Sequence, residues 1–158
     1  MSVSKTNAMR ILDSKKVNYQ TFTYDTNDGK IDGVTVAQKI GKDPEMVFKT
    51  LVSISANKSI HVFVIPVEKE LDLKLAAKVA GEKKVDLLPV KDLLSTTGYI
   101  RGGCSPVGMK KSFPTYFDEL INNLDEAIVS GGKIGIQLQL KVNDLIQTTR
   151  GKIAIISK

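Results

Sequence analysis

Apolar and polar positions along this chain follow two different periods, and these periods mark its expected helices and strands. Near the N-terminus, Ala8, Ile11 and Leu12 recur at spacings of three and four residues, which predicts a helix that Ser4 can cap. Residues 19–24 alternate with a period of two instead, which is typical of a strand. The chain is therefore expected to begin with a helix followed by a strand.

The strongest β signal is a pair of apolar runs at residues 48–56 and 60–67, joined by Asn57 and Lys58. Both runs are rich in β-branched and aromatic residues, and the connection favours a turn. We expect these two runs to form a hairpin.

Three short segments combine a start signal with a terminal glycine, which predicts short helices. In the first segment, Thr35 and Gln38 have the spacing of a helix capping box. The segments are Thr35–Gly41, Asp72–Gly81 and Pro89–Gly98.

The last third of the chain alternates again, at residues 127–129, 134–140 and 153–156, with a short helix around residues 144–146. Strands and helices are interleaved without a regular βαβ period, which predicts an α+β fold with a mixed, curved β-sheet. At 158 residues the chain is expected to form a single domain over residues 1–158.

Composition narrows the function only slightly. The formal net charge of +6 favours acidic partners such as nucleic acid, although the basic residues are dispersed along the chain. The single cysteine excludes an internal disulfide, and no apolar run is long enough for a signal peptide or a membrane span. We therefore expect a cytoplasmic protein that does not associate with membranes.

The common catalytic side-chain sets are missing from the sequence. His61 is the only histidine and lies within an apolar strand, so a Ser-His-Asp or Cys-His site lacks a base. One histidine and one cysteine cannot supply the usual zinc ligands, and the acidic residues do not cluster, so no metal site is expected. Cys104 has no evident base nearby in the sequence, which disfavours it as a nucleophile.

Two glycine-rich segments and one lysine remain as candidates. The segments are 102–106 and 130–132, and neither matches a dinucleotide-binding or Walker A motif. Their glycines could turn backbone N–H groups toward a ligand or could simply form turns. Lys49 shares one strand face with Val47 and Leu51, so it either points into a pocket or extends along apolar surface to water.

Four motifs resemble the YbaK/EbsC family of Cys-tRNA(Pro) deacylases. They occur in the family's order and spacing, and the resemblance covers essentially the whole chain. The motifs are residues 47–52 (VFKTLV), 70–74 (ELDLK), 95–108 (STTGYIRGGCSPVG) and 130–133 (SGGK).

The resemblance implies a curved mixed sheet surrounded by helices, as in the editing insertion of prolyl-tRNA synthetases, and hydrolysis of cysteine wrongly esterified to proline tRNA. It implies no cofactor, and it makes prolyl-tRNA synthetase a plausible partner besides tRNA. The family's essential lysine falls on Lys49, with Gly102 and Gly103 as the expected backbone donors. Substrate contacts are implied for Tyr24, Thr50, Ser105, Pro106, Ser130, Gly131 and Gly132.

Two departures from the family pattern leave the amino-acid preference open. A pocket aromatic is replaced near Ile31 and Asp32, and an acid that follows the S-G-G turn is Gln137 here. Two alternatives therefore stay open beside Cys-tRNA(Pro) hydrolysis. One is a deacylase that uses water on another small aminoacyl-tRNA such as Ala-tRNA(Pro), and the other is a non-catalytic module that binds a nucleotide or an RNA end.

Overall fold

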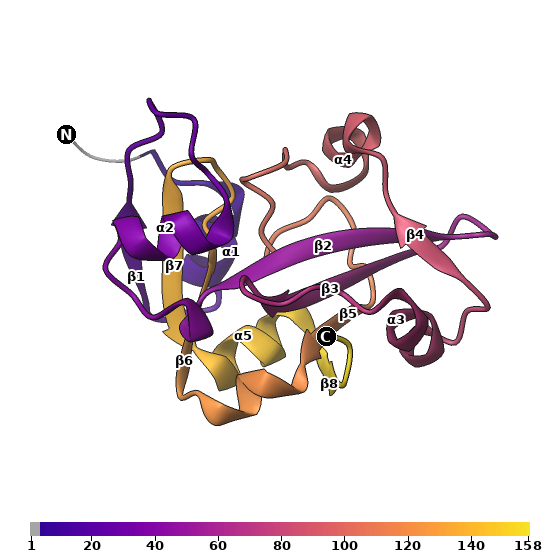
Figure 1. Ribbon diagram of the computed structural model, residues 1–158. Helices are drawn as coiled ribbons and strands as arrows, with labels where there is room; N and C mark the ends of the chain where they lie inside the picture. Colours follow the sequence, from indigo (N-terminus) through magenta and orange to yellow (C-terminus); the bar gives the residue numbers. More distant parts are fainter. Residues whose placement is uncertain (1–3) are drawn as a thin grey trace.

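A five-stranded mixed sheet forms the larger half of the molecule. The computed structural model describes residues 4–158. The strand order is β4-β2-β3-β5-β8, in which β4, β2 and β3 are antiparallel neighbours and β3, β5 and β8 run parallel (Figure 1). The strands are β2 (Phe48–Ser55), β3 (Ile60–Pro66), β4 (Val85–Leu87), β5 (Thr115–Asp118) and β8 (Lys152–Ala154).

A second sheet of three antiparallel strands stands against the start of β2. Its order is β1-β7-β6, and a single parallel bridge between Val47 and Ile128 connects the two sheets. The strands are β1 (Tyr19–Thr23), β6 (Glu126–Ser130) and β7 (Ile136–Lys141). The bridge brings the end of β1 and the turn after β6 close to β2.

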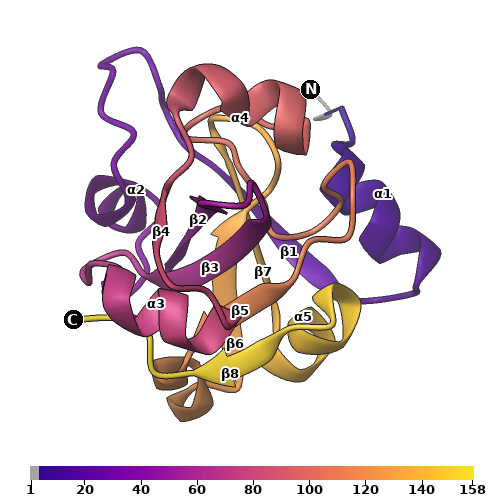
Figure 2. The same ribbon diagram turned by 90° about the vertical axis from the view of Figure 1, so that its right-hand side faces the viewer.

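Five α-helices surround the two sheets in the described part of the chain (Figure 2). They are α1 (Asn7–Ser14), α2 (Gly33–Lys39), α3 (Leu73–Ala80), α4 (Val90–Thr97) and α5 (Val142–Thr149), with 3-10 turns at Pro44–Met46 and Glu119–Asn123. None of the helices described for residues 4–158 has the length and apolar content needed to cross a lipid bilayer.

The main hydrophobic core lies between the two sheets. Side chains from both sheets contribute to it, including Val62, Phe117 and Leu138, each of which is fully buried. Leu12 of α1 and Leu145 of α5 complete the same cluster. Because both sheets contribute to one core, the position of one sheet fixes the position of the other.

The α+β class, the mixed sheet and the predicted hairpin are confirmed. The structure adds that the strands divide between two sheets. The expected helix and strand at the N-terminus are also present, although Thr6 caps α1 in place of Ser4, since its side chain accepts the N–H of Met9. The capping box expected at Thr35 is wrong, because the Asp32 carboxylate caps α2 by accepting the N–H of Thr35.

Two strands gave no usable signal in the sequence. β4 has only three residues and β5 only four, and all four residues of β5 are buried. β5 is buried on both faces and therefore lacks the polar-apolar alternation by which strands are recognised, and β4 is too short to show a period.

Candidate functional site

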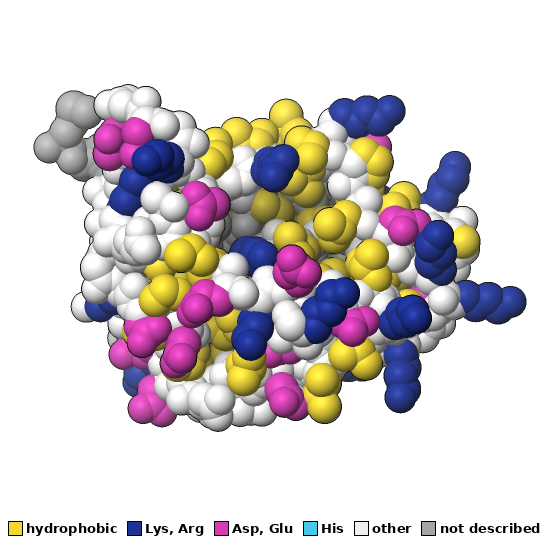
Figure 3. All heavy atoms as spheres, viewed as in Figure 1, with side chains coloured by type: hydrophobic (Ala, Val, Ile, Leu, Met, Phe, Trp, Pro, Cys, Tyr) yellow, Lys and Arg dark blue, Asp and Glu magenta, His cyan; other side chains and the backbone are white. Residues whose placement is uncertain are grey.

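A cleft of about 1020 Å³ opens beside the first half of β2, and its lining comes from segments far apart in the sequence. Figure 3 shows the hollow on this face of the molecule, with hydrophobic side chains gathered around it. Its lining lies within residues 24–36, 47–52, 67, 87–93, 101–104, 130 and 137. Its volume is near the upper end of the range for cavities that hold a small molecule or the end of a larger one.

Five of the residues expected at the site line this cleft. They are Tyr24, Lys49, Thr50, Gly102 and Ser130. Lys49 is half-buried in the second position of β2, and no carboxylate of residues 4–158 forms an ion pair with it. Its ammonium group is therefore available to a ligand in the cleft.

The other five expected residues do not line the cleft. Ser105 is fully buried, and its Oγ accepts the N–H of Val107 at 3.2 Å. Pro106 faces a different pocket. Gly103, Gly131 and Gly132 lie behind the lining and act through packing.

Gly103 packs directly against the backbone of the turn that follows β6. A β-carbon at this position would lie 2.9 Å from the backbone nitrogen of Ile134 and 3.0 Å from the carbonyl carbon of Lys133. Backbone atoms cannot move aside as a flexible side chain can, so only glycine allows this approach. The two glycine segments are thus parts of one packed unit.

Tyr99 and Thr6 hold the same unit from its other side. The Tyr99 hydroxyl donates to the carbonyl of Val107 at 2.6 Å, and its ring lies where a β-carbon on Gly132 would approach to 2.9 Å. The Thr6 hydroxyl donates to the carbonyl of Gly131 at 2.5 Å. Burial raises the pKa of Tyr99 to about 12, so its hydroxyl stays a donor at neutral pH.

The backbone N–H groups of the two glycine segments differ in availability. The N–H of Gly103 donates to the carbonyl of Ile100 at 2.9 Å, and the N–H of Gly131 donates to Ile136. The N–H of Gly132 donates to Ser130 Oγ. No residue within 4–158 accepts a hydrogen bond from the N–H of Gly102 or of Cys104, and both residues line the cleft.

Three polar side-chain atoms are buried in the cleft wall without a partner among the described residues. They are the Tyr24 hydroxyl, Thr50 Oγ1 and Gln137 Oε1. Leaving one such atom unpaired costs about 1–3 kcal/mol, so a cleft that gathers three of them is suited to a polar ligand. Gln137 is 6% exposed and pairs across the sheet with Ser130, which sets both side chains at the same end of the cleft.

Lys39 fixes the loop that forms one wall of the cleft. Its ammonium group donates to the carbonyls of Asp25 and Lys30, at 2.7 and 2.9 Å, and to the Asp28 carboxylate at 2.8 Å. The hydrogen bond from Lys39 holds the pKa of Asp28 below its usual value. The role of Lys39 could not be predicted from the sequence, because a lysine in the last turn of a helix is also favoured simply by the helix dipole.

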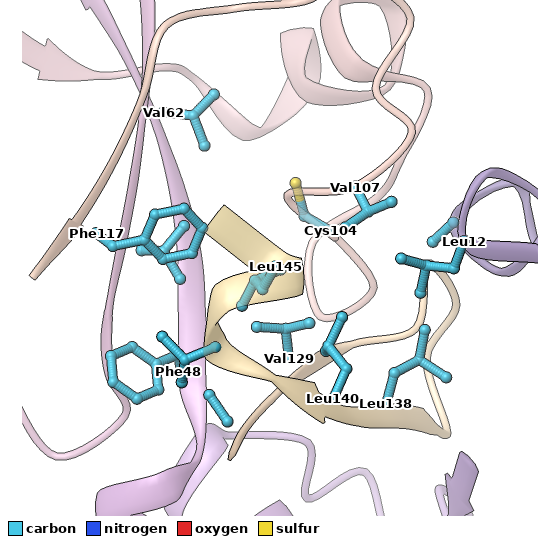
Figure 4. Close-up of a cluster of buried hydrophobic side chains, with 14 of the residues drawn as sticks. Leu12, Phe48, Val62, Cys104, Val107, Phe117, Val129, Leu138, Leu140 and Leu145 are labelled. Atoms are coloured by element: carbon cyan, nitrogen blue, oxygen red, sulfur yellow. The ribbon is translucent and has the colours of Figure 1, made fainter. Parts of the chain in front are cut away.

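Cys104 contacts the main core more than the cleft. It is 7% exposed and lies among apolar side chains that include Val107 (Figure 4). Burial raises the pKa of its thiol to about 12, an effect that a hydrogen bond with Thr97 partly offsets. A thiol that stays protonated at neutral pH is a poor nucleophile. No group of three or more His, Cys, Asp or Glu side chains within residues 4–158 is placed to hold a metal ion.

Two sequence comparisons relate this chain to proteins of aminoacyl-tRNA editing. A family profile described as "Aminoacyl-tRNA editing domain" matches residues 32–148. A protein of Enterococcus faecalis named "Putative Cys-tRNA(Pro)/Cys-tRNA(Cys) deacylase EbsC" is 44% identical over 153 residues, which cover 97% of this chain and 93% of that protein.

Solved structures agree on the fold. The crystal structure titled as that of "a putative trans-editing enzyme for prolyl tRNA synthetase" has a TM-score of 0.83 at 21% identity, covering 99% of both chains. That of a hypothetical protein has a TM-score of 0.87 at 19% identity, covering 97% of this chain and all of the other. At these identities the likeness concerns the fold alone.

We predict that Gly103→Ala lowers the free energy of unfolding by about 1–3 kcal/mol, because the added methyl group meets backbone atoms of Lys133 and Ile134. Urea unfolding followed by circular dichroism measures the change. Gly29→Ala shows the cost of backbone strain without a steric contact, since Gly29 has a φ of +71° and nothing within 4 Å of a β-carbon. An unchanged free energy of unfolding in Gly103→Ala would show that the close packing is absent.

We also predict that iodoacetamide modifies Cys104 at least about 100-fold more slowly at pH 8 in the folded protein than in urea. The pKa of the thiol is raised from 9.0 to about 12, which lowers the thiolate fraction. Mass spectrometry of timed samples measures both rates. Equal rates in the two states would contradict the burial of this thiol.

Proposed function

This chain belongs to the aminoacyl-tRNA editing domain family, and on that basis we propose its function. The chain hydrolyses the ester between a wrongly attached amino acid and the 3′-terminal ribose of tRNA, and its preferred substrate is Cys-tRNA(Pro). The observation that carries the proposal is the cleft itself, which is lined by Lys49 and by three residues whose buried polar atoms have no partner among the described residues. The name of the Enterococcus faecalis relative supports the same substrate.

The reacting sulfur belongs to the substrate in this proposal. The cysteinyl thiol attacks its own ester carbonyl, so that a carbon–sulfur bond forms and the carbon–oxygen bond to the ribose breaks. The thiol proton ends on the ribose oxygen, and water then opens the resulting thiolactone to free cysteine. This scheme fits a site in which the protein's own thiol, Cys104, is buried and protonated.

Backbone donors stabilise the negative charge that develops on the carbonyl oxygen. We assign this role to the N–H groups of Gly102 and Cys104, which have no acceptor within residues 4–158. Gly103 supports them by packing, since its own N–H already bonds to Ile100. One such donor is typically worth about 3–4 kcal/mol in the transition state.

The remaining polar groups orient the substrate. Lys49 supplies positive charge to the terminal phosphate or ribose. Gln137 Oε1 can only accept, so it suits the substrate's ammonium group. Ser130 Oγ accepts the N–H of Gly132 and keeps its own proton to donate to the terminal nucleotide.

Apolar side chains in the lining of the cleft suit the terminal nucleoside. Leu87 and Val90 line the cleft although they are 50% and 59% exposed. Exposed apolar side chains at the edge of a cleft commonly mark a binding surface. We assign them to contact with the ribose and base of the terminal adenosine.

The proposal extends to the cellular setting. Prolyl-tRNA synthetase is the proposed partner, because it is the enzyme that produces a mischarged proline tRNA. We accordingly place the activity in the cytoplasm, where tRNA is charged.

We predict that Lys49→Ala lowers kcat/KM for Cys-tRNA(Pro) deacylation by about 100-fold or more, because one oriented charge–substrate contact is lost. Release of labelled cysteine from charged tRNA measures the rate. Lys69→Ala removes an exposed lysine outside the cleft and should keep the wild-type rate. A Lys49→Ala protein that folds normally and retains full activity would remove this lysine from the mechanism.

We further predict that a serine ester on the same tRNA is hydrolysed more than about tenfold more slowly than the cysteine ester, since a hydroxyl is a much weaker nucleophile than a partly ionised thiol. Alanine and serine esters are compared with cysteine in single-turnover assays. Similar rates for all three esters would favour attack by water. No acceleration of any ester would favour a module that binds without turnover.

A further inference from the structure

A second pocket of about 280 Å³ is lined in part by residues 106–109, which follow Gly102 closely in the chain. Its lining shares no residue with the cleft described above. The lining comes from α1, α5 and the segment before β5, and comprises Ile11, Lys15, Pro106, Val107, Gly108, Met109, Lys111, Ser112, Phe113, Thr115, Thr148, Thr149 and Arg150. We call this the basic pocket.

The charge of the basic pocket is one-sided. Lys15, Lys111 and Arg150 line it, and no acidic residue does. None of these three cations forms an ion pair with a carboxylate of residues 4–158. Three unpaired cations around one opening repel each other, and a bound anion would relieve that repulsion.

The helix ends at the pocket oppose this charge only in part. Lys15 caps the C-terminus of α1 and Arg150 caps that of α5, and each helix end carries about half a negative charge. Two half charges against three full positive charges still leave the pocket at about +2. The last carbonyls are also bonded, since the N–H of Gly151 donates to Ile146 and the N–H of Lys15 donates to Ile11.

Arg150 occupies a backbone position that does not favour arginine. Its φ of +54° lies in the left-handed region, where a helix C-cap is usually glycine or asparagine. Any other residue there costs about 1 kcal/mol. Despite this strain, the residue at this position is an arginine, whose long cationic side chain lines the pocket.

We propose that the basic pocket binds a backbone phosphate of the tRNA whose 3′ end enters the cleft. The choice of RNA rests on the proposed function. The volume fits a phosphate group with part of a ribose and falls short of the roughly 300 Å³ at which sites for whole small ligands begin. Ser112 also lines the pocket, and its hydroxyl can donate to the same phosphate.

The two sites lie within reach of one RNA strand. Gly102 lines the cleft and Pro106 lines the basic pocket, and the four residue steps between them span at most about 14 Å. A strand that ends in the cleft can therefore pass around this segment and leave a phosphate at the pocket. The segment from Gly102 to Gly108 would then contact RNA on both sides.

The test compares two triple variants that lose the same charge. Lys15→Ala/Lys111→Ala/Arg150→Gly removes the cations of the basic pocket, and Lys69→Ala/Lys78→Ala/Lys83→Ala removes three exposed lysines outside both pockets. Each lowers the formal net charge from +6 to +3. Arg150→Gly also relieves the left-handed strain, so the pocket variant should unfold at an equal or higher urea concentration than wild type.

The probe is an uncharged tRNA(Pro) transcript, so that the result does not depend on deacylation. We expect the pocket variant to bind it about tenfold more weakly than the control variant at 0.1 M KCl, with a slope of log K against log[KCl] that is smaller by about 1. Equal affinity and equal slope for the two variants would overturn the proposal. If deacylation fails while this difference persists, the proposed function is wrong and the RNA contact remains.

A second experiment distinguishes binding of RNA from binding of free phosphate at the basic pocket. Amide NMR spectra of the wild type and the pocket variant are recorded with inorganic phosphate and with the transcript. We expect the transcript to shift the amides of Gly108 and Arg150 at micromolar concentration, and inorganic phosphate to do so only at far higher concentration. Tight binding of inorganic phosphate with no effect of the pocket variant on tRNA affinity would overturn the RNA assignment.

Discussion

The close contact between Gly103 and the backbone of Lys133 and Ile134 is the constraint on which the cleft depends. It joins two segments that are about thirty residues apart in the sequence and leaves no space for a β-carbon between them. Tyr99 closes the unit by bonding to Val107 while its ring covers Gly132. Gly102 and Ser130 reach the same cleft because the segments that carry them cannot separate.

A rigid backbone unit suits a reaction in which the protein supplies few reactive groups. Preset N–H groups need no reorganisation when charge develops on a substrate oxygen, so rigidity contributes directly to the rate. The polar side chains that line the cleft are three cations, one carboxylate, hydroxyls and one amide, and its one thiol is kept protonated by burial. The charged residues are Lys30, Lys49, Arg101 and Asp32. Such a site favours a substrate that brings its own nucleophile.

The sequence allowed the prediction of what depends on local pattern or on motif order. The hairpin of β2 and β3, the glycine ends of α3 and α4, and the presence of Lys49, Thr50 and Gly102 at one site were predicted. The strand β5 could not be predicted, because a short buried strand has no alternation. Gly103 and Ser105 belong to the same motif as Gly102, yet they act through packing and an internal hydrogen bond, and motif membership does not separate these roles from ligand contact.

The most direct test of the account is a crystal structure with 3′-deoxy-3′-(cysteinylamino)adenosine, a non-hydrolysable mimic of the tRNA end. We expect the carbonyl oxygen of the mimic to lie about 2.7–3.1 Å from the backbone nitrogen of Gly102 or Cys104. We also expect the cysteinyl ammonium group beside Gln137 and the ribose near Lys49. A mimic bound elsewhere, or bound in the cleft with its carbonyl turned toward solvent, would contradict the account.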